Sequence, residues 1–378
     1  MAAAEDNTTI LTFKFRLLVN KRQHKALAAI LNQQRFIYNA CLESRIDCYR
    51  KTGKSLSYMT QTKHLTELRQ DAVYASLPVN LQRWTLSRLD DAYRSFFRRI
   101  KRGDKPGFPR FRGKDRWRSF GFAELGGLRF DGNRIRFKGL CGGLRVHLHR
   151  PLPPAGKLLS ATFTTDAKGW HVCFHMRVEK QALPSTGNAV GIDMGLKELL
   201  VLSTGEAIPN VRKAKNAERE QRIRQRALAR CKRGSKRRLK VKRRLVRVLE
   251  HTARARRTYA HQISARLVRE NDFIAIEDLN VKGLAAGMLA KSVHDAGWGM
   301  LRQMLTYKAA NADRKLVAVS PRHTSQTCPE CGNIKAKTLT ERVHSCACGC
   351  VMDRDVAAAK VILQRGCSEL RATERRAA

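Results

Sequence analysis

The sequence has 378 residues, enough for several domains that each bury a core of their own. Hydrophobic residues make up 43 % of it, a share that argues against a wholly disordered chain. Lys and Arg number 75 against 32 Asp and Glu, so the formal net charge is +43 and we expect a nucleic acid as the partner. Because the chain has no run of about 18 apolar residues and no secretory signal at residues 1–10, we expect no membrane partner and a cytoplasmic location with the nucleoid.

The first 180 residues predict strands that are interrupted by helices. Residues 12–19 alternate between apolar and basic side chains like a strand, and the apolar spacing then becomes helical. We expect helices near residues 22–42, 60–68 and 81–102. Alternating runs with turn residues between them predict strands at residues 128–130, 135–137, 145–148, 160–165 and 170–178.

The simplest architecture for this half is a β-barrel with a helical bundle inserted after its first strand. The barrel would comprise residues 1–20 and 106–185, and the bundle residues 21–105. Aromatic and basic residues interleave through both parts, as a surface for single strands or phosphate backbones requires. Core aromatics with a solvated rim are the alternative explanation for any one of these residues.

A carboxylate within an apolar strand opens the second half of the chain. Residues 189–195 are apolar or glycine except for Asp193, and a second apolar run at residues 199–202 completes a hairpin. A strand that is buried on one face hides no acid unless the acid has a partner, and a metal ion is such a partner. Alone the pattern is weak, because sugar-kinase-like and RNase-H-like folds both begin in this way.

A second apolar strand, residues 272–277, ends in Glu277. Strand alternation directs the next residue, Asp278, to the opposite face. An acid that is simply solvated at a strand end is the alternative interpretation of Glu277.

A third acid, Asp355, begins an Ala-rich helix. The small residues Ala358 and Ala359 would let this helix pack closely against a sheet and carry the acid to the strands. Helix capping is the alternative role of Asp355. Asp353 competes for the catalytic role, and we prefer Asp355 because it lies at the helix entrance.

An acid within a strand, one at a strand end and one on a helix describe an RNase-H-like nuclease centre. We predict Asp193, Glu277 and Asp355 as the catalytic residues and as ligands of Mg²⁺ or Mn²⁺, because hard carboxylate oxygens suit these ions. Two such ions about 3.5–4 Å apart can activate a water and stabilise the leaving oxygen of a phosphodiester.

Five of the eleven cysteines fall within one short window, which favours metal ligation in a reducing compartment over disulfides. Two close pairs with a glycine after each suit a tetrahedral, structural Zn²⁺ with no open position. The predicted ligands are Cys328, Cys331, Cys346 and Cys348. The second pair has one intervening residue, so Cys350 and His344 remain alternatives for the fourth ligand.

A strongly basic segment, residues 211–270, lies between the first two acids. Uncharged residues at helical spacing accompany its charges, namely Leu245, Leu249, Thr252, Tyr259, Ile263 and Leu267. We predict a helical hairpin that turns near Gly234, with one face on the core and the other toward phosphates. The expected nucleic-acid contacts are Arg222, Arg226, Lys236, Arg237, Arg238, Lys242 and Arg243.

These motifs, in this order and spacing, resemble the TnpB (OrfB) proteins of insertion sequences, relatives of type V CRISPR effectors. The resemblance runs over almost the whole chain. Besides the three acid segments, it covers Tyr38-Asn39, Gly107 to Phe111, Asp295 to Trp298 and Thr324 to Cys328. The family usually has Asn where this chain has Ala357 and Val361.

The resemblance implies an α+β multidomain protein: a β-barrel wedge domain with its inserted helical recognition domain, then a RuvC-like α/β nuclease domain. The nuclease domain would comprise residues 186–320 and 351–366, interrupted by the basic helical arm and by a zinc ribbon at residues 321–350. We expect a disordered tail at residues 367–378.

The implied activity is RNA-guided cleavage of double-stranded DNA beside a short adjacent motif, with a guide RNA from the transposon end. Two alternatives remain. One is a nuclease-weak, RNA-guided DNA-binding protein, suggested by Ala357. The other is a transposase that acts without RNA.

Overall fold

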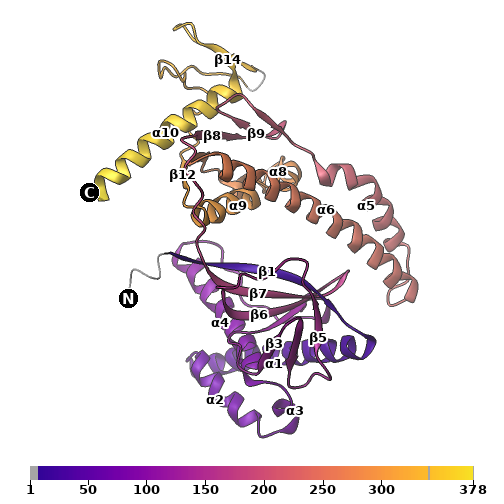
Figure 1. The fold of residues 1–378 in the computed structure, drawn as a ribbon. Helices are drawn as coiled ribbons and strands as arrows, with labels where there is room; N and C mark the ends of the chain where they lie inside the picture. Colours follow the sequence, from indigo (N-terminus) through magenta and orange to yellow (C-terminus); the bar gives the residue numbers. More distant parts are fainter. Residues whose placement is uncertain (1–6, 339–340, 378) are drawn as a thin grey trace. The chain divides into compact units, whose positions relative to one another are not determined.

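The computed structural model describes residues 7–338 and 341–377. The chain divides into two compact units, Met1–Glu179 and Lys180–Ala378, and both mix helices with strands (Figure 1). Among the described residues, no helix is both long and apolar enough to cross a bilayer.

Unit 1 contains an antiparallel sheet of seven strands in the order β2-β6-β7-β1-β5-β4-β3. The strands are β1 (Thr8–Leu18), β2 (Ser119–Phe122), β3 (Leu128–Asp131), β4 (Arg134–Phe137), β5 (Leu144–His147), β6 (Lys157–Asp166) and β7 (Gly169–Glu179). Their alternating apolar side chains, such as Phe13 and Phe15 of β1, form one core. The rings of Phe122 on β2 and Phe137 on β4 lie 5.3 Å apart although these strands belong to opposite ends of the sheet. The sheet is therefore strongly curved and nearly closed.

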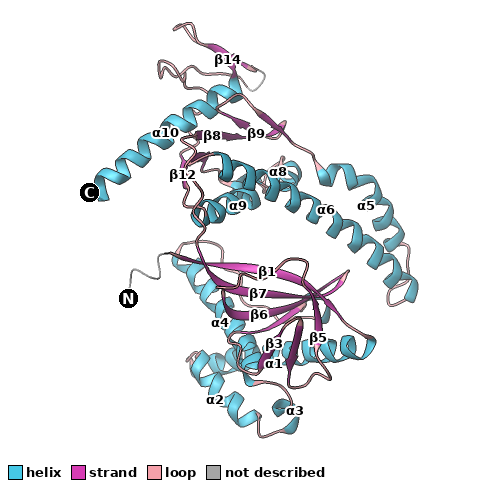
Figure 2. Cartoon of the chain, viewed as in Figure 1, coloured by secondary structure: helices cyan, strands magenta, loops and turns pink. Residues whose placement is uncertain are grey.

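Four α-helices lie in the chain between β1 and β2 and pack beside this sheet (Figure 2). They are α1 (Lys21–Thr52), α2 (Tyr58–Leu68), α3 (Ala72–Ala75) and α4 (Val79–Lys101), and a 3-10 turn, η1 (Lys114–Arg116), follows. Asn20 and Gln23 form a capping box at the start of α1. The fully buried Thr85 hydroxyl donates to Gln34 Oε1 over 2.7 Å, which joins α4 to α1. Strand β2, which had no predicted counterpart, packs so closely on α4 that a Cβ at Gly121 would meet Trp84 at 2.8 Å.

Unit 2 is organised on a five-stranded sheet in the order β10-β9-β8-β11-β12. The strands are β8 (Ala189–Met194), β9 (Glu198–Leu202), β10 (Ala207–Pro209), β11 (Phe273–Glu277) and β12 (Lys315–Val319). The first three are antiparallel neighbours, whereas β11 runs parallel to both β8 and β12. Ile276 pairs with Ile192, and Glu277 and Asp193 are the next residues of their strands. The register therefore places these two acids at the same edge of the sheet.

Helix α10 (Arg354–Ala377) lies against this sheet, as the small residues Ala358 and Ala359 led us to expect. A Cβ at Gly191 would meet Ala359 O at 2.0 Å, and a Cβ at Gly366 would meet Ala275 Cβ at 2.6 Å. The absence of both side chains lets the helix approach the strands and brings Asp355 toward Asp193.

The prediction of a disordered tail at residues 367–378 is wrong for residues 367–377, which continue α10. Cys367 and Leu370 pack against the buried cluster around Phe273. Glu374 forms an ion pair with Lys315 of β12. These contacts hold the last turns of the helix against the sheet, although their charged composition had suggested disorder.

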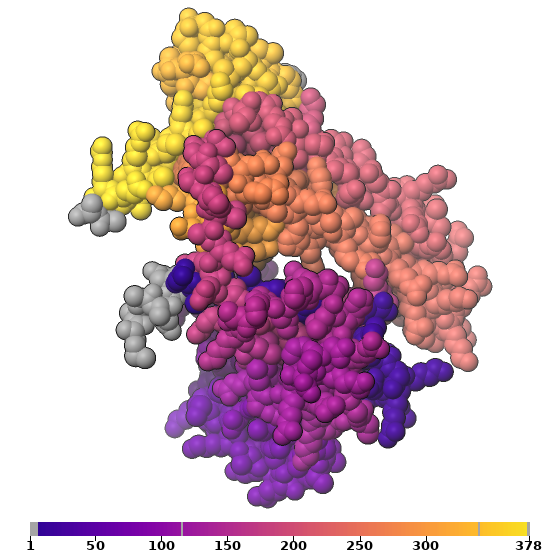
Figure 3. Space-filling view, in the orientation of Figure 1, coloured from indigo at the N-terminus to yellow at the C-terminus, as the bar shows by residue number. Residues whose placement is uncertain are grey.

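The basic segment forms a helical hairpin, the arm, made of α5 (Lys213–Ala229) and α6 (Lys236–Glu270). Gly234 makes the turn with a φ of 80°, and Ser235 caps α6. The second half of α6 is buried against the core through residues such as Ile263 and Leu267. Leu249, predicted on this buried face, is 42 % exposed because the arm has already left the core there. Figure 3 shows the arm as a ridge that projects from the rest of unit 2.

Three shorter helices, α7 (Val281–Leu284), α8 (Ala290–Ala296) and α9 (Trp298–Asn311), connect β11 to β12. Asp295 of α8 accepts hydrogen bonds from the backbone N–H groups of Ala214 and Lys215, at 2.8 and 3.1 Å. This carboxylate caps the N-terminus of α5, so it fastens the base of the arm to the core. The sequence pattern had predicted neither these helices nor β12.

The contact at Gly191 predicts a large effect of a single methyl group. Gly191→Ala should lower the free energy of unfolding by about 3 kcal/mol or more, because α10 must move away from β8. Gly287→Ala is the control, since the one atom near its Cβ, Leu284 O, lies 3.9 Å away. Denaturant unfolding of both variants tests this, and equal stabilities would contradict the close approach of α10.

Candidate active site and metal-binding cluster

The three predicted acids come from β8, β11 and α10 of unit 2, and Asp193 interacts with both of the others. Asp193 is half-buried near the end of β8, Glu277 is the buried last residue of β11, and Asp355 is in the first turn of α10. Burial, followed by repulsion from Glu277 and then from Asp355, raises the pKa of Asp193 to about 8. The three carboxylates therefore form one electrostatic centre.

Glu277 lies in the most protected part of this centre. Burial raises its pKa, whereas a hydrogen bond from Thr324 and the charge of Arg365 act in the opposite direction. The Thr324 hydroxyl donates to Glu277 Oε1 over 2.6 Å. The neighbouring acid, Asp278, forms an ion pair with Arg302 of α9 and belongs to a different environment.

The choice between Asp353 and Asp355 has a structural basis. Asp353 Oδ1 accepts hydrogen bonds from the N–H groups of Asp355 and Val356, at 2.8 and 3.2 Å. Asp353 therefore caps α10, the role that had been the alternative for Asp355. Asp355 Oδ1 instead accepts two bonds from the Arg354 guanidinium, each 3.2 Å long.

The two departures from the family pattern lie in packed positions. Ala357 and Val361 are both buried along α10. An Asn at either position would need hydrogen-bond partners in this interior, whereas the apolar side chains need none. Neither residue carries a metal ligand, so the three acids remain as a set.

The chemistry of the acid centre fits divalent cations. Neighbouring carboxylates with a raised pKa gain from a nearby positive charge, and oxygen ligands suit Mg²⁺ or Mn²⁺. The acids are more widely spaced than the cysteine cluster: within residues 7–338 and 341–377, only cysteine-containing groups bring three or more ligand atoms within 4.8 Å of one another.

The cysteines meet in the insert between β12 and α10, which contains the hairpin β13 (Val343–Ser345) and β14 (Val351–Asp353). The Sγ atoms of Cys328, Cys331, Cys346 and Cys348 all lie within 4.8 Å of one another. Cys328 Sγ is 3.6 Å from Cys348 Sγ, and Cys331 Sγ is 3.6 Å from Cys346 Sγ. All eleven cysteines are free. The group could hold a metal ion such as zinc.

The turns and charges around this cluster suit a metal. Gly332 and Gly349 lie next to the cysteine pairs with φ values of 74° and 90°, which residues other than glycine rarely adopt. Burial acts to raise the pKa of Cys328, but the N–H groups of Cys331 and Glu330 outweigh it and lower that pKa to about 5, which favours the thiolate. The alternative ligands His344 and Cys350 are buried and form a second group with Cys328.

The predicted nucleic-acid contacts lie on the arm. Six of the seven are exposed: Arg222, Arg226, Lys236, Arg237, Lys242 and Arg243. Arg238 is half-buried and donates to the carbonyls of Leu228 and Cys231, at 2.7 and 3.1 Å. Arg238 therefore ties the two arm helices together at their turn, which makes it a structural residue as well as a cation.

The interleaved aromatic and basic residues expected in unit 1 include an exposed group near the end of α4. Phe97, Phe108 and Phe111 are about half exposed near the end of α4 and in the loop after it. The Phe96 ring lies 5.2 Å from that of Phe97 and 5.3 Å from that of Phe108. The neighbouring basic residues of the same segment are exposed, namely Arg94, Arg98, Arg99, Lys101, Arg102, Lys105 and Arg110. Such a surface offers bases a ring to stack on and phosphates a charge.

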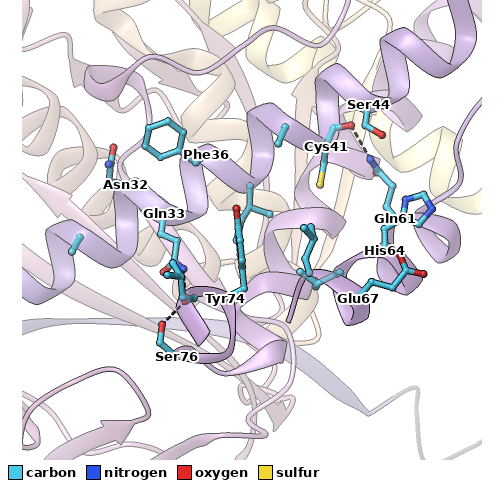
Figure 4. Close-up of a pocket in the computed structure, with 16 residues that line it drawn as sticks. Asn32, Gln33, Phe36, Cys41, Ser44, Gln61, His64, Glu67, Tyr74 and Ser76 are labelled. Carbon is cyan, nitrogen blue, oxygen red and sulfur yellow. Dashed lines mark hydrogen bonds between the residues drawn. The ribbon is translucent and has the colours of Figure 1, made fainter. Parts of the chain in front are cut away.

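A cavity of about 1010 Å³ lies among α1, α2 and α3 of unit 1 (Figure 4). Phe36, Cys41, Leu65 and Tyr74 give it a largely apolar lining. Its lining residues include none of the predicted site residues. The cavity is therefore lined by a different part of the chain from the predicted acids and the cysteine cluster.

Three family models match successive parts of the chain. The OrfB_IS605 model, described as "Probable transposase", matches residues 171–287. One described as "Cas12f1-like, TNB domain" matches residues 298–362, and the "Helix-turn-helix domain" of OrfB_IS605 matches residues 9–54. In this chain residues 9–54 form β1 and the long helix α1 rather than two short helices.

A Streptomyces pristinaespiralis protein named "Putative RNA-guided DNA endonuclease" is 32 % identical over 362 residues, which cover 94 % of this chain and 89 % of that protein. The chain belongs to the TnpB (OrfB) family. A second member, "Putative RNA-guided DNA endonuclease InsQ" of Escherichia coli, is 27 % identical and is covered to 92 % of its length. The family resemblance found in the motifs is thus confirmed.

Solved structures show that the fold is shared with CRISPR effectors. The Cas12f1 chain of a "Cas12f1-sgRNA-target DNA complex" superposes with a TM-score of 0.62 at 14 % identity, covering 91 % of this chain and 83 % of that one. A "mini-RNA-guided endonuclease CRISPR-Cas_phi3" gives a TM-score of 0.50 at 9 % identity, covering 95 % of this chain and 92 % of that one.

The raised pKa of Asp193 predicts how stability depends on pH. The folded carboxyl, with a pKa of about 8, holds its proton more tightly than the unfolded one at 3.8. Below pH 3.8 the Asp193 carboxyl is protonated in both the folded and the unfolded state. Between pH 3.8 and about 8 it is ionised in the unfolded state but still protonated in the folded state. The free energy of unfolding in magnesium-free buffer should therefore fall as the pH rises from about 4 to 8.

Asp193→Asn removes this dependence. At pH 8 it should be more stable than the parent by about 1–3 kcal/mol, because an amide carries no charge to desolvate. Glu206→Gln, an exposed acid on the turn between β9 and β10, is the control and should keep the parental slope. Denaturant unfolding at pH 5 and pH 8 measures both, and identical slopes in all three proteins would contradict the shift.

The cysteine cluster predicts one zinc ion per chain. Cys331→Ser and Cys346→Ser should each lose most of the zinc, whereas Cys141→Ser, an exposed cysteine of unit 1, should retain it. Elemental analysis of the purified variants measures this. If Cys350→Ser loses zinc and Cys348→Ser retains it, Cys350 rather than Cys348 is the fourth ligand.

Proposed function

We propose that this chain is an RNA-guided DNA endonuclease that cuts guide-matched DNA next to a short adjacent motif. The observation that carries the proposal is the arrangement of Asp193 and Glu277 at one edge of the sheet with Asp355 on the closely packed helix α10, where the three acids form one electrostatic centre. Membership of the TnpB family adds to it, because family members of similar length are named RNA-guided DNA endonucleases.

The topology of unit 2 supports a RuvC-like nuclease domain. Three antiparallel strands followed by two parallel ones, in the spatial order third-second-first-fourth-fifth, are the arrangement of an RNase-H-like sheet. We assign residues 186–320 and 351–366 to this domain, the arm included, and residues 321–350 to a zinc ribbon. Residues 1–20 and 106–185 would form the wedge domain, and residues 21–105 the recognition domain.

The reaction class that fits is hydrolysis of a phosphodiester by in-line attack of water. Two bound Mg²⁺ ions would supply the Lewis acidity for the attacking and the leaving oxygen. Asp193, Glu277 and Asp355 would hold the ions, and this requires Asp193 to release the proton that burial favours. Thr324 fixes the orientation of Glu277, and Arg354 that of Asp355.

The partners that we propose are a guide RNA from the transposon end and target double-stranded DNA. The net charge of +43 and the exposed cations of the arm suit a large polyanion. The aromatic surface around Phe97 suits unpaired bases. Binding through so many cations should weaken steeply as the salt concentration rises.

The decisive experiment is cleavage of a matched target by the protein with its co-purified RNA. Asp193→Asn and Glu277→Gln should each lower the cleavage rate in Mg²⁺ at least about 100-fold, because each removes several kcal/mol of charge stabilisation, while the bound RNA is retained. Glu206→Gln is the matched control and should cleave like the parent.

Three outcomes would revise the proposal. Cleavage that persists in both acid variants would move the active site elsewhere. Tight binding of the matched target without nicking in Mg²⁺ or Mn²⁺ would identify an RNA-guided DNA-binding protein. The absence of a discrete co-purifying RNA would favour a transposase that acts without one.

A further inference from the structure

We infer that the zinc-binding insert, residues 321–350, positions two of the three acids, so that its folding sets the cation affinity of the acid centre. The inference rests on the proposed function for the role of the acids. It is carried by two contacts. Thr324, near the start of the insert, holds Glu277, and Arg354 of α10, which is hydrogen-bonded to Glu341 and Arg342 of the insert, holds Asp355.

The first contact is buried and short. The Thr324 side chain is 4 % exposed, and its hydroxyl lies 2.6 Å from Glu277 Oε1 but 3.2 Å from Pro321 O. A hydroxyl has one proton to donate, and the shorter distance and the charge of the carboxylate both favour Glu277. Buried inside the protein, this bond holds the carboxylate in one orientation.

Thr324 is joined to the cysteine cluster by a single turn of chain. The N–H groups of Gln326 and Thr327 both donate to His323 O, at 3.1 and 2.9 Å. The first zinc ligand, Cys328, follows directly and bonds through its own N–H to Asn333 O at 2.8 Å. A displacement of Cys328 therefore passes to Thr324 through a hydrogen-bonded turn rather than a loose loop.

In the second contact, the Arg354 side chain binds both the insert and the acid Asp355. Arg354 Nη1 donates to Glu341 O over 2.9 Å, and the Arg354 N–H donates to Arg342 O over 2.7 Å. The same guanidinium gives Nε and Nη2 to Asp355 Oδ1. Its planar fork can thus orient Asp355 only while residues 341 and 342 are in place.

Both contacts leave the acids able to bind a cation. Each uses one carboxylate oxygen, Oε1 of Glu277 and Oδ1 of Asp355, so the second oxygen of each can serve as a ligand. Groups that orient ligands in this way change metal affinity by about 10–100-fold when they are removed. Thr324 and Arg354 are therefore positioning residues rather than catalytic ones.

The insert is also fastened to α10 by contacts that reach no acid. Gln364 Nε2 donates to Pro329 O over 2.6 Å. Gln364→Ala removes an anchor of the insert while leaving Thr324 and Arg354 intact, so it is a matched control for simple loosening.

The test uses the full-length protein with its co-purified RNA and measures Mn²⁺ binding by electron paramagnetic resonance, zinc content by elemental analysis, and the Mg²⁺ concentration that gives half-maximal cleavage. Thr324→Val should weaken Mn²⁺ binding about 10-fold or more and raise the Mg²⁺ midpoint to a similar extent. Thr324→Ser should restore both, because it returns the hydroxyl. Zinc content should be unchanged, and Gln364→Ala should bind Mn²⁺ like the parent.

Arg354→Lys adds a second readout, since it keeps the positive charge but loses the planar fork. It should weaken Mn²⁺ binding several-fold. Removing zinc through Cys331→Ser should weaken it as well, with the RNA still bound.

The inference is overturned if Thr324→Val binds Mn²⁺ like the parent, or if Thr324→Ser fails to restore what Thr324→Val loses. Its failure differs from that of the proposed function. A parent protein that binds Mn²⁺ but cuts no matched DNA contradicts the nuclease assignment alone, because the Mn²⁺ measurements on the variants still decide the role of the insert.

Discussion

Repulsion among three carboxylates is the interaction around which unit 2 is arranged. Asp193, Glu277 and Asp355 come from three separate elements, and burial, followed by repulsion from the other two acids, raises the pKa of Asp193 far above that of a free carboxyl. The fold tolerates this because Thr324 and Arg354 donate hydrogen bonds to Glu277 and Asp355, and the charge of Arg365 favours the ionised form of Glu277. The fold also packs α10 closely against the strands, since Gly191 and Gly366 carry no side chain there. A strongly shifted pKa held in place by such packing is typical of a functional site.

Two centres of contrasting chemistry lie close together in the chain. The cysteine cluster offers soft sulfur ligands with no open position, which suits a structural zinc, whereas the acid centre offers hard oxygen ligands. The hairpin of β13 and β14 leads from one to the other, and Asp353 at its end caps the helix that carries Asp355. The insert is therefore continuous with the wall of the proposed active site.

Much of the fold was accessible from local patterns. Apolar runs that end in Asp193 and Glu277 predicted the strands, and the small residues after Asp355 predicted the closely packed helix. The elements that the sequence did not predict depend on residues far away in the chain. β12 and the end of α10 find their apolar neighbours only in the folded sheet, and Leu249 lies where the arm has left its core. Thr324 lies in a segment that carries the family resemblance, but no spacing in the sequence linked it to Glu277, which is 47 residues away.

Helix α6 passes without interruption from the exposed arm into the buried core (Figure 1). Its 35 residues make a rod of roughly 50 Å, so the direction in which the basic side chains point is set by their helical phase relative to Ile263 and Leu267. One residue inserted between the two regions would rotate the cations by roughly 100° about the helix axis. The number of residues in α6 thus sets the direction in which the cations of the arm point. Only insertions of about one or more whole helical turns would keep that direction.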